Sequence, residues 1–244
     1  MIIWLASYPR SGNTFFRMLL HYTCGLKTYS IYNDPLFDRL EASDAIGHEP
    51  LPAPIQTLDR ADEPYFVKTH DVPADDRPAI YLVRDGRDAL VSFARFLQSF
   101  EQPRGHVKGI VNNLLGRTGF HTTLKNLITG RQRYGGWSGN VHAWLNRPAA
   151  AHTRVIRYED LVAQPEHVLG QAMEGFGISM SAHDGQSMPD MASLHARWPQ
   201  FFRKGRAGSW REEMPPELHE LFWRHHERVM VELGYDAEIA AAVA

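Results

Sequence analysis

The chain has 244 residues, of which 43% are hydrophobic and 22% are charged, a composition that excludes disordered, fibrous and membrane-embedded proteins. A chain of this length buries roughly 70 to 75% of its unfolded surface, so we expect one domain over residues 1–244. The net charge is −2, which excludes the strongly basic surface of a dedicated nucleic-acid binder. The charge is uneven, however, because no acidic residue precedes Asp34 and none lies between Glu101 and Glu159. This distribution predicts a local site for an anion.

The compartment is predicted from the single cysteine and from the first residues. Cys24 cannot form an intramolecular disulfide or a cysteine-based zinc site, which favours a reducing compartment. The apolar run 2–6 is too short for a signal peptide or a membrane span. We therefore expect a cytoplasmic protein without a membrane span.

Short apolar runs alternate with helical patterns along the chain. The runs predict strands at residues 1–7, 65–68, 79–84 and 154–158. Helical spacing of apolar residues predicts helices at 14–25, 87–100, 137–146, 161–176 and 216–234, the last with His225 on its apolar face. This alternation predicts an α/β fold with a mostly parallel central sheet and helices on both faces. Seven glycines in the interval 102–136 predict short helices and a mobile cover.

The first candidate motif is Tyr8-Pro9-Arg10-Ser11-Gly12-Asn13-Thr14, between the first strand and the first helix. Backbone N–H groups at a helix N-terminus cradle anions, and a glycine lets an anion approach the backbone closely. Ser11 and Thr14 add hydroxyl donors, and Arg10 adds a full charge. An ordinary strand-to-helix turn with a Ser or Thr cap has the same pattern. The motif lacks the G-K-[ST] ending of a Walker A loop.

Three further motifs carry basic or proton-accepting side chains. Lys68 and His70 end the second predicted strand, and ligands of parallel sheets bind beyond such strand ends. Arg84 ends the next strand and Ser92 lies on the following helix, so both could contact one phosphate. We expect the neighbouring Arg87 and Asp88 to form a surface ion pair. Each motif alone also fits a solvated strand end or basic turn, as does the fourth motif, Arg203-Lys204-Gly205.

Together and in this order, the motifs resemble those of sulfotransferases of the cytosolic type, which use 3′-phosphoadenosine 5′-phosphosulfate (PAPS). The first motif resembles their 5′-phosphosulfate loop, Tyr-Pro-Lys-Ser-Gly-Thr-Thr, with a P-loop-like strand-loop-helix. Lys68-Thr69-His70 resembles their Lys-x-His segment, and residues 84–92 resemble their 3′-phosphate-binding strand and helix. Tyr158-Glu159-Asp160 resembles a segment that faces the adenine, and residues 203–210 resemble the C-terminal signature. The resemblance covers essentially the whole chain.

The resemblance implies transfer of a sulfuryl group from PAPS to a hydroxyl or amine, which leaves PAP. It implies His70 as general base and Lys68 and Arg10 as stabilisers of negative charge, without a metal. The implied donor-binding residues are Arg10, Ser11, Gly12, Asn13, Thr14, Phe15, Arg84, Ser92, Tyr158, Arg203, Lys204 and Gly205. The implied acceptor is a small molecule or natural product. The family's dimerisation segment is absent after Trp210, which leaves the oligomeric state open.

The departures of the chain from the family pattern include the following three. Arg10 replaces a Lys, Phe15 replaces a Trp, and Ser209 replaces an Asp.

Two other functions remain open: a P-loop-like kinase, disfavoured by the missing G-K-[ST], and a non-catalytic PAP-binding module. Aromatic residues suggest an apolar acceptor pocket, although core packing is the favoured explanation for most of them taken singly. They are Phe93, Phe96, Phe100, Trp137, Trp144, Trp198 and Phe201.

Overall fold

The computed structural model describes residues 1–32, 41–101, 119–179, 187–199, 201–203 and 205–235. Lys204 and residues 102–118 of the expected cover segment lie outside the described residues. The chain forms two compact units. One comprises residues 1–84 and 143–205, and the other comprises residues 85–142 and 206–244.

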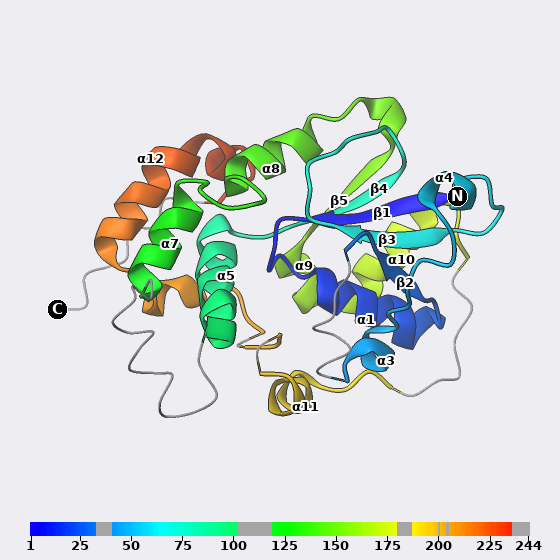
Figure 1. Cartoon of the computed structure of the whole chain (residues 1–244), viewed down its shortest axis with the longest axis horizontal. Helices are drawn as coiled ribbons and strands as arrows, with labels where there is room; N and C mark the ends of the chain where they lie inside the picture. Colours follow the sequence, from blue (N-terminus) through cyan, green and yellow to red (C-terminus); the bar gives the residue numbers. More distant parts are fainter. Residues whose placement is uncertain (33–40, 102–118, 180–186, 200, 204, 236–244) are drawn as a thin grey trace. The chain divides into compact units, whose positions relative to one another are not determined.

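The first unit contains a five-stranded sheet in the order β2-β3-β1-β4-β5, with every pairing parallel (Figure 1). The strands are β1 Ile2–Ser7, β2 Thr28–Ser30, β3 Tyr65–Thr69, β4 Ala79–Val83 and β5 Thr153–Arg157. The predicted parallel α/β sheet is thus confirmed. The strand β2 was not predicted because three residues show no apolar run or alternation.

Both faces of the central strand β1 are covered. Successive residues of a strand point to opposite faces, and all six residues of β1 are buried. On one face, Ile3 and Leu5 belong to a core cluster with apolar side chains of α1 Asn13–Cys24, α9 Tyr158–Ala163 and α10 Pro165–Gly175 (Figure 1). On the other face, the ring of Trp144 stacks on Tyr81 of β4 at 5.6 Å.

The largest differences from the predicted boundaries lie between β5 and α10. The predicted strand 154–158 ends at Arg157, because Tyr158 is the first residue of α9. The single predicted helix 161–176 is two helices, since α9 ends at Ala163 and α10 begins at Pro165. Proline lacks a backbone N–H and is tolerated at the first position of a helix, where no intrahelical bond is needed.

Short helices complete the first unit. They are α3 Ser43–Ile46, α4 Ile55–Leu58, the 3-10 turn η1 Ala149–Ala151, and α11 Met191–Arg197. A second core cluster joins Met18 of α1 to Ile46 of α3 and to Leu194 and Trp198 in and after α11. Trp198 is therefore part of a core in this unit.

The second unit is helical. Its elements are α5 Gly86–Glu101, α7 Phe120–Ile128, the start of α8 Trp137–Leu145, the 3-10 turn η2 Ser209–Glu212, and α12 Pro216–Glu232. A Cβ atom on Gly86 would lie 2.8 Å from both Phe222 and Trp137, so a glycine lets α5 begin against these rings. The prediction that His225 faces the core is wrong. His225 is exposed, and the adjacent His226 is buried in its place.

Arg87 and Asp88 do not form the expected surface ion pair, because both are buried and have other partners. Arg87 makes an ion pair with Asp85 at 2.7 Å, and its guanidinium lies over the ring of Trp210 at 4.1 Å. Asp88 accepts hydrogen bonds from the backbone N–H groups of Gly208 at 2.6 Å and Trp210 at 2.9 Å, and from the hydroxyl of Ser209 at 3.0 Å. Adjacent helix residues point in different directions, so the expected pair was geometrically unfavourable.

No helix in the described parts of the chain is both long enough and apolar enough to cross a membrane.

Replacing Asp88 with Ala should lower the free energy of unfolding by about 3 kcal/mol, because the substitution leaves buried donors without an acceptor. Urea unfolding followed by fluorescence measures this change. Replacing the exposed Glu227 of α12 with Ala is the matched control and should change the unfolding free energy little. Equal stability of the two variants would contradict the prediction.

The buried His226 should make stability depend on pH. Burial, followed by the neighbouring His225, lowers the pKa of His226 to about 4, whereas the unfolded chain has the ordinary value of about 6.5. The unfolded state therefore binds more protons between these values, and the free energy of unfolding falls by about 3 kcal/mol as the pH drops from about 6.5 to about 4.

Replacing His226 with Gln should flatten this part of the stability curve, measured by urea unfolding between pH 4 and pH 8. Replacing the exposed His167 of α10 with Gln is the control and should leave the slope as in the wild type. An unchanged slope in the His226→Gln variant would contradict the assignment.

Candidate active site

The predicted site residues of the first unit follow the carboxyl ends of three neighbouring strands. Residues 8–12 follow β1, His70 follows β3, and Arg84 follows β4. The registers Ala6↔Thr69 and Ser7↔Leu82 place these ends at one edge of the sheet. Ligands of parallel sheets bind at this edge.

The loop after β1 leads into a helix start that no side chain caps. Helix α1 has no side-chain hydrogen bond at its N-terminus and no acidic residue in its first turn, so the alternative of a turn capped by Ser or Thr is not what the structure contains. Arg10 and Gly12 have φ values of 70° and 100°. The Ser11 hydroxyl is buried and has no hydrogen-bond partner among the described residues. An anion would satisfy this hydroxyl and the first N–H groups of α1.

The next three residues have different surroundings. The Asn13 amide donates to the carbonyl of Leu5 at 2.9 Å and lies 3.3 Å from the Ser7 hydroxyl. Its side chain therefore ties α1 to β1. Of the groups of Asn13, only the backbone N–H supports a role in anion binding. Thr14 and Phe15 are half-buried, and Phe15 packs against the core cluster of the sheet.

Three guanidinium groups gather around the loop. The Arg84 side chain donates to the carbonyl of Arg10 at 3.3 Å, and the Arg10 side chain donates to the carbonyl of Phe201 at 2.6 Å. Burial lowers the pKa of Arg10 to about 10, and the charges of Arg84 and Arg203 act in the same direction, whereas Tyr158 opposes them. Arg10 therefore remains positively charged at neutral pH. The mutual repulsion of the three guanidinium groups favours a bound anion of high charge.

Tyr158 lies between the loop and Arg84. The guanidinium of Arg84 is 4.2 Å from the centre of the Tyr158 ring. A Cβ atom on Gly12 would meet the same ring at 2.7 Å, so the glycine is needed for the close approach of Tyr158 as well as for its φ of 100°. Gly205, with a φ of 62°, is packed in the same way against Met191.

His70 is oriented by the end of β1. Its Nδ1 atom lies 2.8 Å from the carbonyl oxygen of Ser7 and 3.3 Å from the Ser7 hydroxyl. A carbonyl oxygen can only accept, so Nδ1 carries the proton and Nε2 carries the lone pair. In this tautomer Nε2 is the basic nitrogen. Lys68 is buried, and its Nζ lies 5.6 Å from the centre of the Tyr32 ring.

Sequence reasoning missed Tyr32, which contacts both Lys68 and His70. The residue follows β2, the strand that the pattern did not reveal. No sequence signal marked a tyrosine that lies 36 residues before Lys68.

Other predicted residues lie in the second unit or in a core. Ser92 is buried on α5 in the second unit, so its expected convergence with Arg84 stays a prediction. Trp137 and Trp144 are buried, like Trp198. For these three tryptophans, core packing is the correct alternative to an acceptor pocket.

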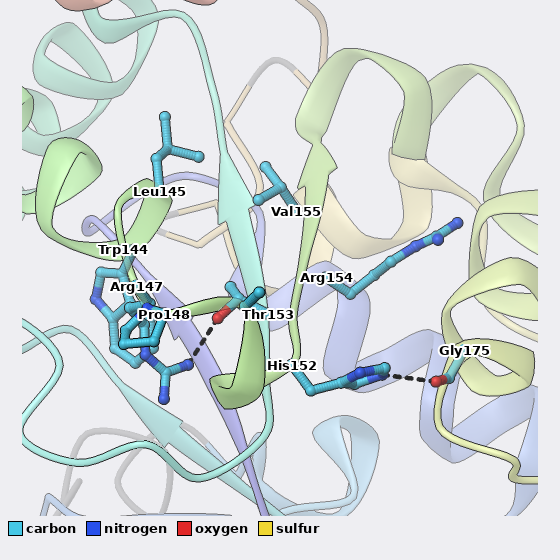
Figure 2. A pocket seen from close by; sticks show the side chains of 10 residues that line it. Trp144, Leu145, Arg147, Pro148, His152, Thr153, Arg154, Val155 and Gly175 are labelled. Atoms are coloured by element: carbon cyan, nitrogen blue, oxygen red, sulfur yellow. Dashed lines mark hydrogen bonds between the residues drawn. The ribbon is translucent and has the colours of Figure 1, made fainter.

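A cavity of about 310 Å³ lies elsewhere in the first unit, at the amino end of β5 (Figure 2). Arg147 donates to Thr153 at 2.8 Å and also to the carbonyls of Asp75 and Arg77, and a ring nitrogen of His152 lies 2.7 Å from the carbonyl oxygen of Gly175. Because the strands are parallel, this cavity is at the opposite edge of the sheet from His70. It is separate from the candidate site.

Within the described residues, no three His, Cys, Asp or Glu side chains are placed to bind a metal ion.

Comparison with known proteins identifies the family. The family model of the sulfotransferase domain matches residues 2–234. The chain belongs to the sulfotransferase family. This agrees with the resemblance of the sequence motifs, and it makes the chain a PAPS-dependent sulfotransferase rather than a kinase or a non-catalytic module.

Individual sulfotransferases are distant from this chain but match nearly all of it. Sulfotransferase 1E1 of Homo sapiens is 25% identical over 266 residues, which cover 93% of this chain and 83% of the relative. Mouse sulfotransferase SULT7A1 complexed with PAP has a TM-score of 0.58 at 18% identity, covering 96% of this chain and 88% of that one. Retinol dehydratase in a complex with retinol and PAP has a TM-score of 0.62 at 17% identity, covering 94% and 81%. These structures share the fold.

Replacing Gly12 with Ala should weaken PAP binding and lower the free energy of unfolding by about 1 to 3 kcal/mol. The alanine would have to adopt a positive φ, and its Cβ would displace Tyr158. Calorimetry with PAP and urea unfolding measure the two effects. Gly170 of α10 has no neighbour within 4 Å of an added Cβ, so Gly170→Ala is the control and should keep wild-type affinity. Wild-type PAP affinity in the Gly12→Ala variant would contradict the prediction.

Proposed function

We propose that this chain transfers the sulfuryl group of PAPS to a hydroxyl or amine of a small-molecule acceptor, with His70 as the general base. The observation that carries the proposal is the juxtaposition of three guanidinium groups and an uncapped helix start with a histidine whose Nε2 is basic. The proposal treats residues 1–244 as one catalytic domain that works in the cytoplasm.

The residues present fit the charge of the donor. The α1 N-terminus, Ser11 and Arg10 would hold the 5′-phosphosulfate, because the Ser11 hydroxyl is buried without a partner among the described residues. Arg84, Arg203 and Gly205 would hold the 3′-phosphate, which carries about −1.5 to −2 charges at neutral pH. Ser92 and Lys204 stay predictions from the resemblance of the motifs. Tyr158 and Phe15 would face the adenine.

The bound donor supplies an activated sulfuryl group and PAP as its leaving group. His70 accepts the proton of the acceptor hydroxyl at Nε2, while the bond from Nδ1 to Ser7 stabilises the imidazolium that forms. Lys68 and Arg10 stabilise negative charge on the sulfuryl group and on the PAP that leaves. Such a role is worth roughly 3 to 4 kcal/mol for a well-placed hydrogen-bond donor.

For the acceptor we propose an apolar small molecule with a hydroxyl group, including natural products of that type. Related folds were solved with retinol and with androsterone, and both compounds are apolar alcohols. The three buried tryptophans do not support an aromatic acceptor pocket. The proposal of an apolar acceptor therefore depends on this analogy alone. A screen of alcohols, phenols and amines with PAPS, read by mass spectrometry as an added SO₃ group, identifies the class.

The test of the proposed base is the His70→Ala variant. Transfer of label from [³⁵S]PAPS to 2-naphthol should fall by a factor of about 10² to 10⁴, as expected for loss of a general base, while calorimetry with PAP should give the wild-type affinity. His167 is exposed on α10, and its replacement by Ala is the control that should change neither quantity. Near wild-type transfer by His70→Ala would contradict the assignment.

A further inference from the structure

We propose that Tyr32 is a positioning residue for the reaction, which holds the imidazole of His70 and the ammonium of Lys68 in their working orientation. This inference rests on the proposed function of His70. It adds a residue that the sequence motifs do not contain.

The backbone brings Tyr32 beside the end of β3. Strand β2 pairs in parallel with β3, with Ser30 opposite Lys68. Beyond the strand, the backbone N–H of Ile31 donates to the carbonyl of Lys68 at 3.3 Å, and that of Tyr32 donates to the hydroxyl of Ser30 at 3.1 Å. Two successive hydrogen bonds therefore fix the start of the turn from which the Tyr32 side chain extends.

The hydroxyl of Tyr32 holds the backbone of the catalytic segment. It accepts a hydrogen bond from the backbone N–H of His70 at 2.7 Å and lies 3.4 Å from the Thr69 hydroxyl. Thr69 in turn accepts from the backbone N–H of Asp71 at 3.1 Å. Removing the Tyr32 hydroxyl would take away the acceptor of the His70 N–H, so the backbone at His70 would lose a restraint.

The ring of Tyr32 holds the imidazole itself. The two rings are stacked, with centroids 5.9 Å apart and an angle of 17° between their planes. The imidazole is thus restrained by the Ser7 carbonyl at Nδ1 and by an aromatic face along its plane. Lys68 Nζ lies 5.6 Å from the centre of the same Tyr32 ring, a distance at which a cation is attracted to an aromatic face. One side chain therefore contacts both groups that we assign to the chemistry.

The hydroxyl and the ring can be removed separately. Tyr32→Phe keeps the ring and loses the hydroxyl, and should lower kcat with [³⁵S]PAPS and 2-naphthol about tenfold, the equivalent of one hydrogen bond. Tyr32→Leu loses both and should lower kcat further, by about 10²-fold. PAP affinity should be unchanged in both variants, because the contacts of Tyr32 given above are with the Lys68 to His70 segment.

A spectroscopic signal of His70 requires no acceptor. In protein labelled with ¹⁵N-histidine and loaded with PAP, the wild type should show His70 as the Nδ1–H tautomer, assigned by its loss in His70→Ala. Tyr32→Leu should show an averaged mixture of tautomers. The control is Tyr29→Leu, because Tyr29 lies on β2 and its ring contacts Tyr65 instead; it should keep the wild-type signal and kcat.

A double-mutant cycle separates positioning from a general loss of structure. If Tyr32 acts through His70, the substitution Tyr32→Phe should cost little further activity when residue 70 is already Ala. A loss as large in that background, or a wild-type His70 signal in Tyr32→Leu, would overturn the inference. The proposed function fails separately, if His70→Ala itself retains transfer. Should Tyr32→Leu not fold, Tyr32→Phe and its cycle decide.

Discussion

The parallel pairing of β1 with both β3 and β4 is the constraint on which the candidate site depends. The strand is buried on both faces, so a slip by one residue would force every side chain into the packing of the opposite face. The register fixes where each strand ends. It therefore brings the anion loop, His70 and Arg84 to one edge, although 76 residues separate Tyr8 from Arg84.

The electrostatics of this edge explain how a chain of net charge −2 can bind a polyanion. Three guanidinium groups lie around the start of α1, whose helix dipole is also positive at that end. Burial and the other arginines lower the pKa of Arg10, which means that charging it costs free energy in the unliganded site. A bound anion reverses this cost. The candidate site therefore favours a bound anion, and its positive charge is local and not a property of the whole surface.

The sequence predicted the regular elements and the motif residues, and missed what depends on distant contacts. Buried strands such as β1 and β4 are revealed by continuous apolar runs, whereas the three residues of β2 carry no periodicity. Asp88 was assigned to the surface because its three donors lie about 120 residues further along the chain. Tyr32 was missed for the same reason. Local pattern identifies groups that do chemistry more readily than the groups that hold them.

Ser7 contacts both the start of α1 and the ring of His70, through its backbone carbonyl and its side-chain hydroxyl. Its carbonyl sets the tautomer of His70, and its hydroxyl lies 3.3 Å from both the Asn13 amide and the His70 ring. The carbonyl is available whatever the side chain at this position, because the end of β1 supplies it. The hydroxyl, in contrast, links the first residue of α1 to the imidazole. In the proposed mechanism, these two contacts connect the start of the donor-binding helix to the general base.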